Sequence, residues 1–134
     1  MDSPVRLIRS AALSDAPYAY AAVVDSGARL VFLAGACPLE PDGTTAAVGD
    51  YVGQAARCIQ NLSEALRAAD ASLRNVVSTR VLVASAQRSD LDAVWDVVHA
   101  AFGDHDVPST LMGVTVLGYE NQLVEIEAVA AIFD

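Results

Sequence analysis

The chain has 134 residues, 54% of them hydrophobic, and a formal net charge of −9. A chain of this length and apolar content fits one domain, residues 1–134, with a substantial core. The eight basic residues are all arginines, which excludes enzymes that need a Schiff-base, pyridoxal-phosphate or P-loop lysine, and the acidic balance argues against nucleic acid as a partner.

The first third of the chain predicts three short strands followed by a loop. Residues 5–9 alternate roughly between apolar and polar side chains, as in a strand. Residues 19–24 and 29–34 are β-prone runs separated by Asp25-Ser26-Gly27-Ala28, a pattern typical of a hairpin with glycine at positive φ. Residues 38–49 contain two prolines and two glycines, so we expect a loop there.

The middle of the chain predicts a helix and a strand. Asp50 is the expected N-cap of a helix that runs to residue 69, with apolar residues at the spacing of one buried face. The β-branched run 76–84 predicts a strand that carries Arg80 at its middle.

The last third predicts a second helix and two more strands. Ser89-Asp90-Leu91-Asp92 resembles a capping box and predicts the start of the helix, which Gly103 ends. Residues 110–117 and 123–132 predict strands joined by a turn at 118–121. The expected order is therefore β-β-β-α-β-α-β-β, an α+β arrangement.

The predicted sheet has two faces and only two helices to cover them. Residues 30–33 and 81–83 are apolar at successive positions, which places apolar side chains on both faces. An uncovered apolar face would exceed the patches of roughly 300–600 Å² found on typical monomers. We therefore expect other copies of the chain to cover it. The apolar pattern predicts an oligomer but not the number of its subunits.

The ends of the chain and its two cysteines indicate a cytoplasmic protein without metal or cofactor. The start Met1-Asp2-Ser3-Pro4 lacks the basic and apolar parts of a signal peptide, and no apolar run reaches the roughly 18 residues of a bilayer span, so no membrane partner is expected. Cys37 and Cys58 lie in different predicted elements without CxxC spacing, and we expect two small buried thiols.

Segments spread over nearly the whole chain resemble the RidA/YjgF family, once named the L-PSP endoribonucleases. The resemblance implies a chorismate-mutase-like α+β fold with a mixed, mainly antiparallel sheet and two helices on one face. It also implies a homotrimer with three clefts between subunits and chemistry on small enamine or imine acids. The segments that carry the resemblance are residues 16–18, 30–39, 54–62, 71–77 and 123–130.

One departure from the family bears on the reaction. In the deaminating branch, water hydrolyses a 2-imino acid, and an arginine before a serine grips the substrate carboxylate. Here Pro108 stands before Ser109, and proline offers neither the charge nor the N–H that binds a carboxylate. The resemblance therefore implies a related hydrolase or deaminase-like enzyme rather than an ordinary 2-iminopropanoate deaminase.

Two residues are the expected catalytic groups. Glu125 matches the family glutamate that positions the attacking water, and Tyr18 follows Pro17 as the cleft tyrosine does in relatives. The alternatives are a solvated or arginine-paired Glu125 and a tyrosine packed at a subunit interface.

The expected ligand-binding residues lie on several elements. Gly35 would let a ligand approach backbone N–H groups, or simply end a strand. Arg80 is the best replacement for the missing guanidinium, against an ion pair with Glu125 or Glu127. Trp95 stands where the family often has asparagine, and forms either a ligand-stacking wall or part of the packing. The full set is Gly35, Ala36, Arg80, Trp95, Pro108, Ser109 and Thr110.

Three functions follow from these residues. The first is an enzyme that hydrolyses a small metabolite, with Glu125 orienting water and Tyr18 assisting. The second is a non-catalytic module that binds a small ligand or a partner in the same cleft. Endoribonuclease activity is a distant third, because the chain is acidic. His99 and His105 have no metal-ligand spacing, and we expect both to be solvated.

Overall fold

The computed structural model describes residues 3–134 and has the predicted order of strands and helices. A short 3-10 turn, η1, was not predicted. The elements are β1 (Val5–Ile8), β2 (Ala21–Val24), β3 (Arg29–Phe32), α1 (Tyr51–Ala68), η1 (Leu73–Asn75), β4 (Val76–Val83), α2 (Arg88–Phe102), β5 (Ser109–Gly113) and β6 (Val124–Ile132).

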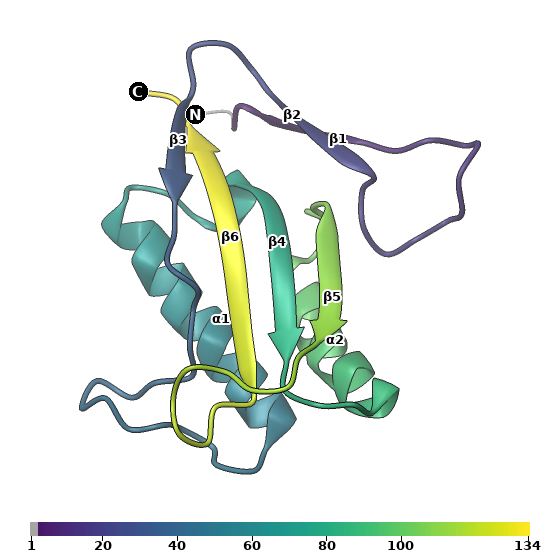
Figure 1. The fold of residues 1–134 in the computed structure, drawn as a ribbon. Helices are drawn as coiled ribbons and strands as arrows, with labels where there is room; N and C mark the ends of the chain where they lie inside the picture. The colour runs from purple at the N-terminus through teal and green to yellow at the C-terminus, as the bar shows by residue number, and fades with distance from the viewer. Residues whose placement is uncertain (1–2) are drawn as a thin grey trace.

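The main sheet has four strands in the order β3-β6-β4-β5. Strands β4 and β5 are parallel, whereas β6 pairs antiparallel with both β3 and β4. Both helices lie on one side of this sheet, and the β1–β2 pair lies apart from it near one end (Figure 1). The predicted α+β class, with a mixed sheet and helices on one face, is confirmed.

The predicted hairpin of residues 19–24 with 29–34 is wrong. Strand β2 pairs with β1, and β3 pairs instead with β6 from Arg29↔Ile132 to Phe32↔Val129. Gly27 does have a positive φ of 85°, as the turn pattern required. The turn chemistry was therefore recognised, but each flanking strand found a better partner elsewhere in the chain.

The final strands also differ from their expected arrangement. β5 ends at Gly113, four residues early, and the segment to β6 crosses the end of the sheet because β5 and β6 flank β4 on opposite sides. A sequence pattern marks a turn but does not tell whether the strands beside it pair with each other.

Helix α1 begins as predicted and α2 does not. The carboxylate of Asp50 accepts a hydrogen bond from Gly53 N at 3.0 Å. Helix α2 has Gln87 as its N-cap, without a side-chain cap. Ser85 organises this start, because its hydroxyl accepts from Gln87 N at 2.9 Å and donates to Asp90 at 2.7 Å. Gly103, with φ 62°, follows the last turn as expected.

The core lies between the helices and the sheet. Alternate residues of β4 and β6 point into it together with the buried face of α1, and the side chains of Leu62, Leu66, Val81 and Ile126 have no exposed surface. None of the helices described for residues 3–134 is long and apolar enough to cross a membrane.

We call the sheet surface turned away from the helices the open face. It is less apolar than the sequence pattern predicted, since charged and apolar residues are mixed on it. Phe32 is 75% exposed there, and Leu30 is 52% exposed. By strand alternation and register, the open face comprises Leu30, Phe32, Ser78, Arg80, Leu82, Thr110, Met112, Glu125, Glu127 and Val129.

Candidate functional site

A row of polar side chains crosses the open face. Arg80 on β4 is opposite Glu127 on β6 and Thr110 on β5. Arg80 Nε lies 3.5 Å from Glu127 Oε1, with side chains 59% and 41% exposed. An ion pair so open to solvent contributes about 0–1 kcal/mol. The guanidinium can therefore exchange Glu127 for an anionic ligand at little cost.

Glu125 lies two residues before Glu127 on β6, on the same face of the sheet, and three neighbouring residues hold it in place. Gln122 Nε2 donates to Glu125 Oε1 at 3.1 Å, and Cys37 Sγ lies 3.3 Å from the same oxygen. The other oxygen, Oε2, packs against Gly35, where an added Cβ would approach it to 2.2 Å. Glycine at position 35 therefore makes room for the carboxylate. We call Glu125, Gly35, Cys37 and Gln122 the carboxylate cluster.

The thiol of Cys37 is a hydrogen-bond donor at neutral pH. Burial, together with the hydrogen bond and the charge of Glu125, raises its pKa to about 11. Cys37 is only partly buried, so the prediction of two buried thiols is right for Cys58 and wrong for Cys37. Burial also raises the pKa of the Cys58 thiol.

Two glutamines, Gln122 in the carboxylate cluster and Gln54 on α1, fix the turn before β6, and neither was predicted as a site residue. The Gln122 side chain is buried and spans the turn before β6, because Oε1 accepts from Tyr119 N at 3.0 Å and Nε2 also donates to Val124 O at 3.1 Å. Gln54 on α1 has no exposed surface, donates to Asn121 O at 2.9 Å and accepts from Leu123 N at 2.7 Å. A polar residue beside the apolar stripe of α1 was the available signal.

Ala36 does not offer free backbone groups to a ligand. Its N–H donates to Ile126 O at 2.7 Å, and its carbonyl accepts from Ile126 N at 3.0 Å. These two bonds fix the segment that carries Gly35 and Cys37 against β6. Gly35 therefore leaves space for the Glu125 side chain. Ala36 holds the segment of residues 35–37 against β6 through its backbone bonds.

Aromatic side chains form a second group, at the β5 edge of the sheet. Tyr18 is edge-on to Trp95, with ring centres 6.5 Å apart and planes at 87°. These two rings line a cavity of about 480 Å³, which we call the aromatic groove. Its residues are Pro17, Tyr18, Trp95, Ser109, Thr110 and Leu111.

A neighbouring cavity of about 300 Å³ connects the aromatic groove with the polar row. Tyr18, Ser109 and Thr110 line both cavities, and Arg80 and Pro108 line the second. Pro108 accepts a hydrogen bond from Thr79 N at 3.0 Å, and Ser109 Oγ is bonded to Thr79 Oγ1 at 2.7 Å. Positions 108 and 110 share one side of the strand, and neither carries a cation. Arg80 supplies the guanidinium in this cavity.

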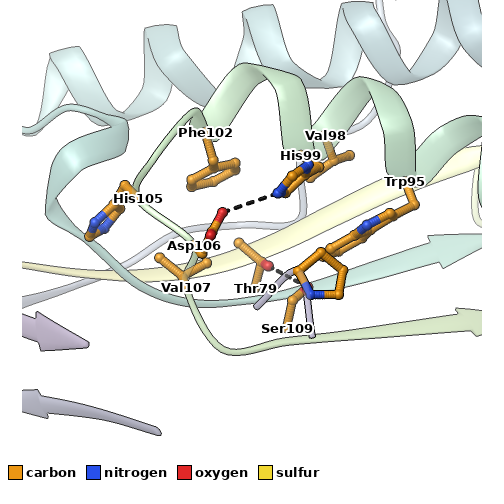
Figure 2. A pocket seen from close by; sticks show the side chains of 10 residues that line it. Thr79, Trp95, Val98, His99, Phe102, His105, Asp106, Val107 and Ser109 are labelled. Carbon is orange, nitrogen blue, oxygen red and sulfur yellow. Dashed lines mark hydrogen bonds and ion pairs between the residues drawn. The ribbon is translucent and has the colours of Figure 1, made fainter. Parts of the chain in front are cut away.

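Trp95, in the wall of the aromatic groove, contacts a polar network of His99, Asp106 and Arg9. His99 Nε2 lies 3.1 Å from Asp106 Oδ1, and Arg9 donates to Asp106 Oδ2 at 2.8 Å. Figure 2 shows His99 between Trp95 and Asp106, beside a space of about 10 Å³, room for one water at most. The His99 side chain is 42% exposed, so it is partly solvated as predicted, and it also contacts Asp106 and Trp95.

His105, unlike His99, is not solvated, and the prediction for it is wrong. It is buried, and its Nε2 lies 2.8 Å from the Val76 carbonyl oxygen. The loop after α2 turns back beneath β4, so a loop position became part of the core. Backbone contact fixes the same loop to the Tyr18 segment, since Ala19 N donates to Asp106 O at 2.8 Å.

The predicted site residues thus fall into two groups within one chain. Tyr18, Arg80, Pro108, Ser109 and Thr110 line one cavity, and Trp95 joins them through the aromatic groove. Glu125 is not among the residues that line these two cavities, although it shares the open face with Arg80. The structure alone therefore separates the expected water-positioning carboxylate from the expected cleft tyrosine.

Comparisons with known proteins agree on one family. The sequence model of the family described as Endoribonuclease L-PSP matches residues 9–132. A Capra hircus protein named 2-iminobutanoate/2-iminopropanoate deaminase is 33% identical over 133 residues, which cover 97% of this chain and 93% of that protein.

Solved structures give the same answer. YyfB of Yersinia pestis, titled a protein of unknown function of the conserved Rid family, matches with TM-score 0.90 and 27% identity over 96% of this chain and 99% of its own. E. coli TdcF, solved with bound serine, matches with TM-score 0.65 and 26% identity over 87% and 89% of the two chains.

Proposed function

Because the chain belongs to the Endoribonuclease L-PSP family, the Rid proteins, we propose that it is a homotrimeric hydrolase acting on a small imine or enamine in clefts between its subunits. Water adds to the imine carbon, the C=N bond breaks, and the nitrogen leaves as ammonia while the carbon becomes a carbonyl. Glu125 orients the water, and Tyr18 assists by hydrogen bonding.

The arrangement around Glu125 is the observation that carries this proposal. Both hydrogen bonds to the carboxylate, from Gln122 and Cys37, end on Oε1. Oε2 packs against Gly35 and accepts neither of these bonds, and we assign to it the acceptance of a proton from water. A carboxylate held this way has one fixed and one working oxygen, as a general base requires.

The trimer is supported by two features of the open face. Phe32 and Leu30 expose large apolar surface on it, which a second copy of the chain would bury. The carboxylate cluster and the aromatic groove lie apart within one chain. A neighbouring subunit that packs its groove against this carboxylate cluster would complete a cleft with Glu125 and Tyr18 on opposite walls.

The substrate is expected to differ from that of the deaminase relatives. Positions 108 and 110 carry no cation, and the guanidinium of Arg80, which lines the same cavity, already faces Glu127. Two parallel charge-assisted bonds to an α-carboxylate are therefore not preformed. We propose an imine or enamine that lacks the α-carboxylate or binds it through Arg80, and not 2-iminopropanoate as the preferred substrate.

The direct test is release of ammonia and carbonyl product from a panel of freshly generated imines. We expect turnover above buffer for some members, weak turnover of 2-iminopropanoate, and a loss of about 100-fold in Glu125→Gln. Glu120→Gln is the matched control, because that residue lies in the turn before β6 outside the cluster. No turnover of any imine would contradict the proposal.

Mixing two variants tests whether the site lies between subunits. Glu125→Gln and Tyr18→Ala should each be inactive alone. After unfolding and refolding together, random assortment in a closed ring of three leaves about a quarter of the clefts with both native residues. We expect about that share of wild-type activity to return. A mixture as inactive as its components would contradict a cleft in which Glu125 and Tyr18 come from different subunits.

A non-catalytic binding module is the second candidate, and the absence of a cation at positions 108 and 110 favours it. In that case a ligand would raise the free energy of unfolding by RT ln(1 + [L]/Kd), and with it the melting temperature, without turnover. The same imine panel, measured by thermal shift and by product release, distinguishes the two functions.

A further inference from the structure

We infer that the aromatic groove selects a planar aromatic group, so that the substrate is an aryl-substituted imine or enamine. This inference rests on the proposed function and goes beyond it by naming the substrate class. The observation behind it is a pair of contacting aromatic side chains on the wall of a cavity of about 480 Å³, which a small aliphatic imine does not fill.

Trp95 is held on two sides and cannot easily turn into the groove. One face of the indole stacks on the His99 ring, with centres 5.9 Å apart and planes at 16°. Tyr18 meets the indole edge-on at 87°, and Tyr20 meets Tyr18 in a similar way with centres 5.6 Å apart. The rings therefore keep the groove open instead of filling it.

The contacts beneath these rings are polar and partly exposed, since the side chains of Arg9 and His99 are 45% and 42% exposed. Asp106 joins His99 to Arg9 through the two contacts of 3.1 and 2.8 Å described above. The same guanidinium donates to the backbone carbonyls of Ala16 and Tyr18 at 3.0 and 3.1 Å. One arginine thus ties the Tyr18 segment to the base of Trp95. A wall ordered before binding loses little freedom when a ligand arrives.

The chemistry of the lining fits an aromatic ring with a polar end. Pro17, Tyr18, Trp95 and Leu111 make the cavity of about 480 Å³ largely apolar. Its polar groups, Ser109 and Thr110, also line the cavity that holds Arg80. A ring that packs against the groove side of Tyr18 and Trp95 would place a polar substituent near Ser109 and Thr110, beside the cavity that Arg80 lines. Contact between a ligand ring and one of these aromatic rings is expected to tighten binding roughly threefold to tenfold over an aliphatic ring.

Trp95 is the only tryptophan in the sequence, so its fluorescence reports occupation of the groove directly. We would titrate the assembled protein with three stable amides that mimic imines: phenylacetamide, cyclohexylacetamide and propanamide. We expect phenylacetamide to change the emission and to bind at least threefold more tightly than cyclohexylacetamide, and tenfold more tightly than propanamide. Equal affinities for the two ring amides, or no change in emission, would overturn the inference.

Variants at position 95 give a second, independent test by calorimetric binding. Trp95→Phe keeps an aromatic wall and should keep the preference for phenylacetamide, whereas Trp95→Asn should lose it. Val116→Ala, at a residue 78% exposed and outside the groove, is the control and should bind like the unchanged protein. A preference that survives in Trp95→Asn would contradict the inference, and the titration of the unchanged protein decides it if that variant does not fold.

The outcomes separate the inference from the function on which it rests. Phenylacetamide binding without turnover of any imine would preserve the aromatic groove and end the hydrolase proposal. Turnover of small aliphatic imines at the same efficiency as the imine of phenylalanine would preserve the hydrolase and end the aromatic selection.

Discussion

The two faces of the four-stranded sheet differ in role: one forms the core with the helices, and the other carries exposed polar and charged side chains. On the side of the helices, Val81 and Ile126 are fully buried and pair directly across β4 and β6. On the open face, their neighbours Arg80 and Glu127 form a solvent-exposed ion pair. Successive residues of a strand point to opposite faces, so stability and chemistry alternate along the same two strands. Substitutions one residue apart should therefore have different kinds of effect.

The largest expected effect is on stability and comes from the face toward the helices. Ile126→Ala should lower the free energy of unfolding by about 3 kcal/mol, because it leaves a cavity in a fully buried site. The adjacent Glu127→Gln should cost less than about 1 kcal/mol, since it only removes an exposed ion pair. Urea denaturation at one fixed protein concentration measures both. Similar losses in the two variants would remove the contrast between the faces.

A second substitution should affect activity and leave the fold intact. Gly35→Ala places a Cβ 2.2 Å from Glu125 Oε2, and the flexible carboxylate must move away. We expect a loss of activity on any imine substrate of about 100-fold, with an unfolding free energy within about 1 kcal/mol of the wild type. Gly118→Ala, where an added Cβ meets nothing within 4 Å, is the control and should change neither. Full activity in Gly35→Ala would show that the position of Glu125 does not matter.

The smallest expected effect is on the reactivity of Cys37. Its pKa of about 11 leaves little thiolate at pH 8, so reaction with iodoacetamide should be slow. Glu125→Gln removes the charge that raises this pKa, although burial, the larger cause, remains. We expect the rate to rise roughly threefold to tenfold, while the fully buried Cys58 stays unreactive in both proteins. Mass spectrometry of the labelled peptides measures each rate. An unchanged rate for Cys37 in Glu125→Gln would show that the carboxylate does not affect the thiol.

The same thiol has a defined effect on stability against pH. Its pKa is higher in the folded chain, about 11, than the ordinary value of 9.0, so the folded state holds this proton more tightly. The stabilisation is complete below about pH 9 and is lost as the pH rises toward 11. Urea midpoints of the wild type should fall across this range more steeply than those of Cys37→Ala.

Local patterns predicted the parts of the fold that local physics governs. The helix after Asp50 has its apolar stripe and its N-cap within one stretch of chain, and both were recognised. The N-terminus of α2 was misplaced because its true organiser, Ser85, precedes the helix and acts through Gln87 and Asp90. Strand pairing was predicted least well, since β3 could join either β2 or β6 and the turn at Gly27 suits both.

The candidate site shows the same division. Glu125, Tyr18 and Trp95 were singled out through the family resemblance, and Arg80 through its charge in an apolar strand. Gln54 was missed because its importance lies in a bond to the distant backbone of Asn121, and Gln122 because it bonds to the irregular turn at Tyr119. His105 was assigned to solvent because its loop position gave no sign that Val76 O would lie 2.8 Å away.

The amino-acid sequence by itself determined which segments form helices and strands, because the spacing of apolar residues and the caps act over a few residues. It also determined the family and the acidic surface, which are matters of residue identity. Only the tertiary structure decided which strands pair, which side chains share the open face, and that Gly35, Cys37 and Gln122 surround Glu125. These contacts join residues up to 90 positions apart, and they form only when the whole sheet and its helices pack together.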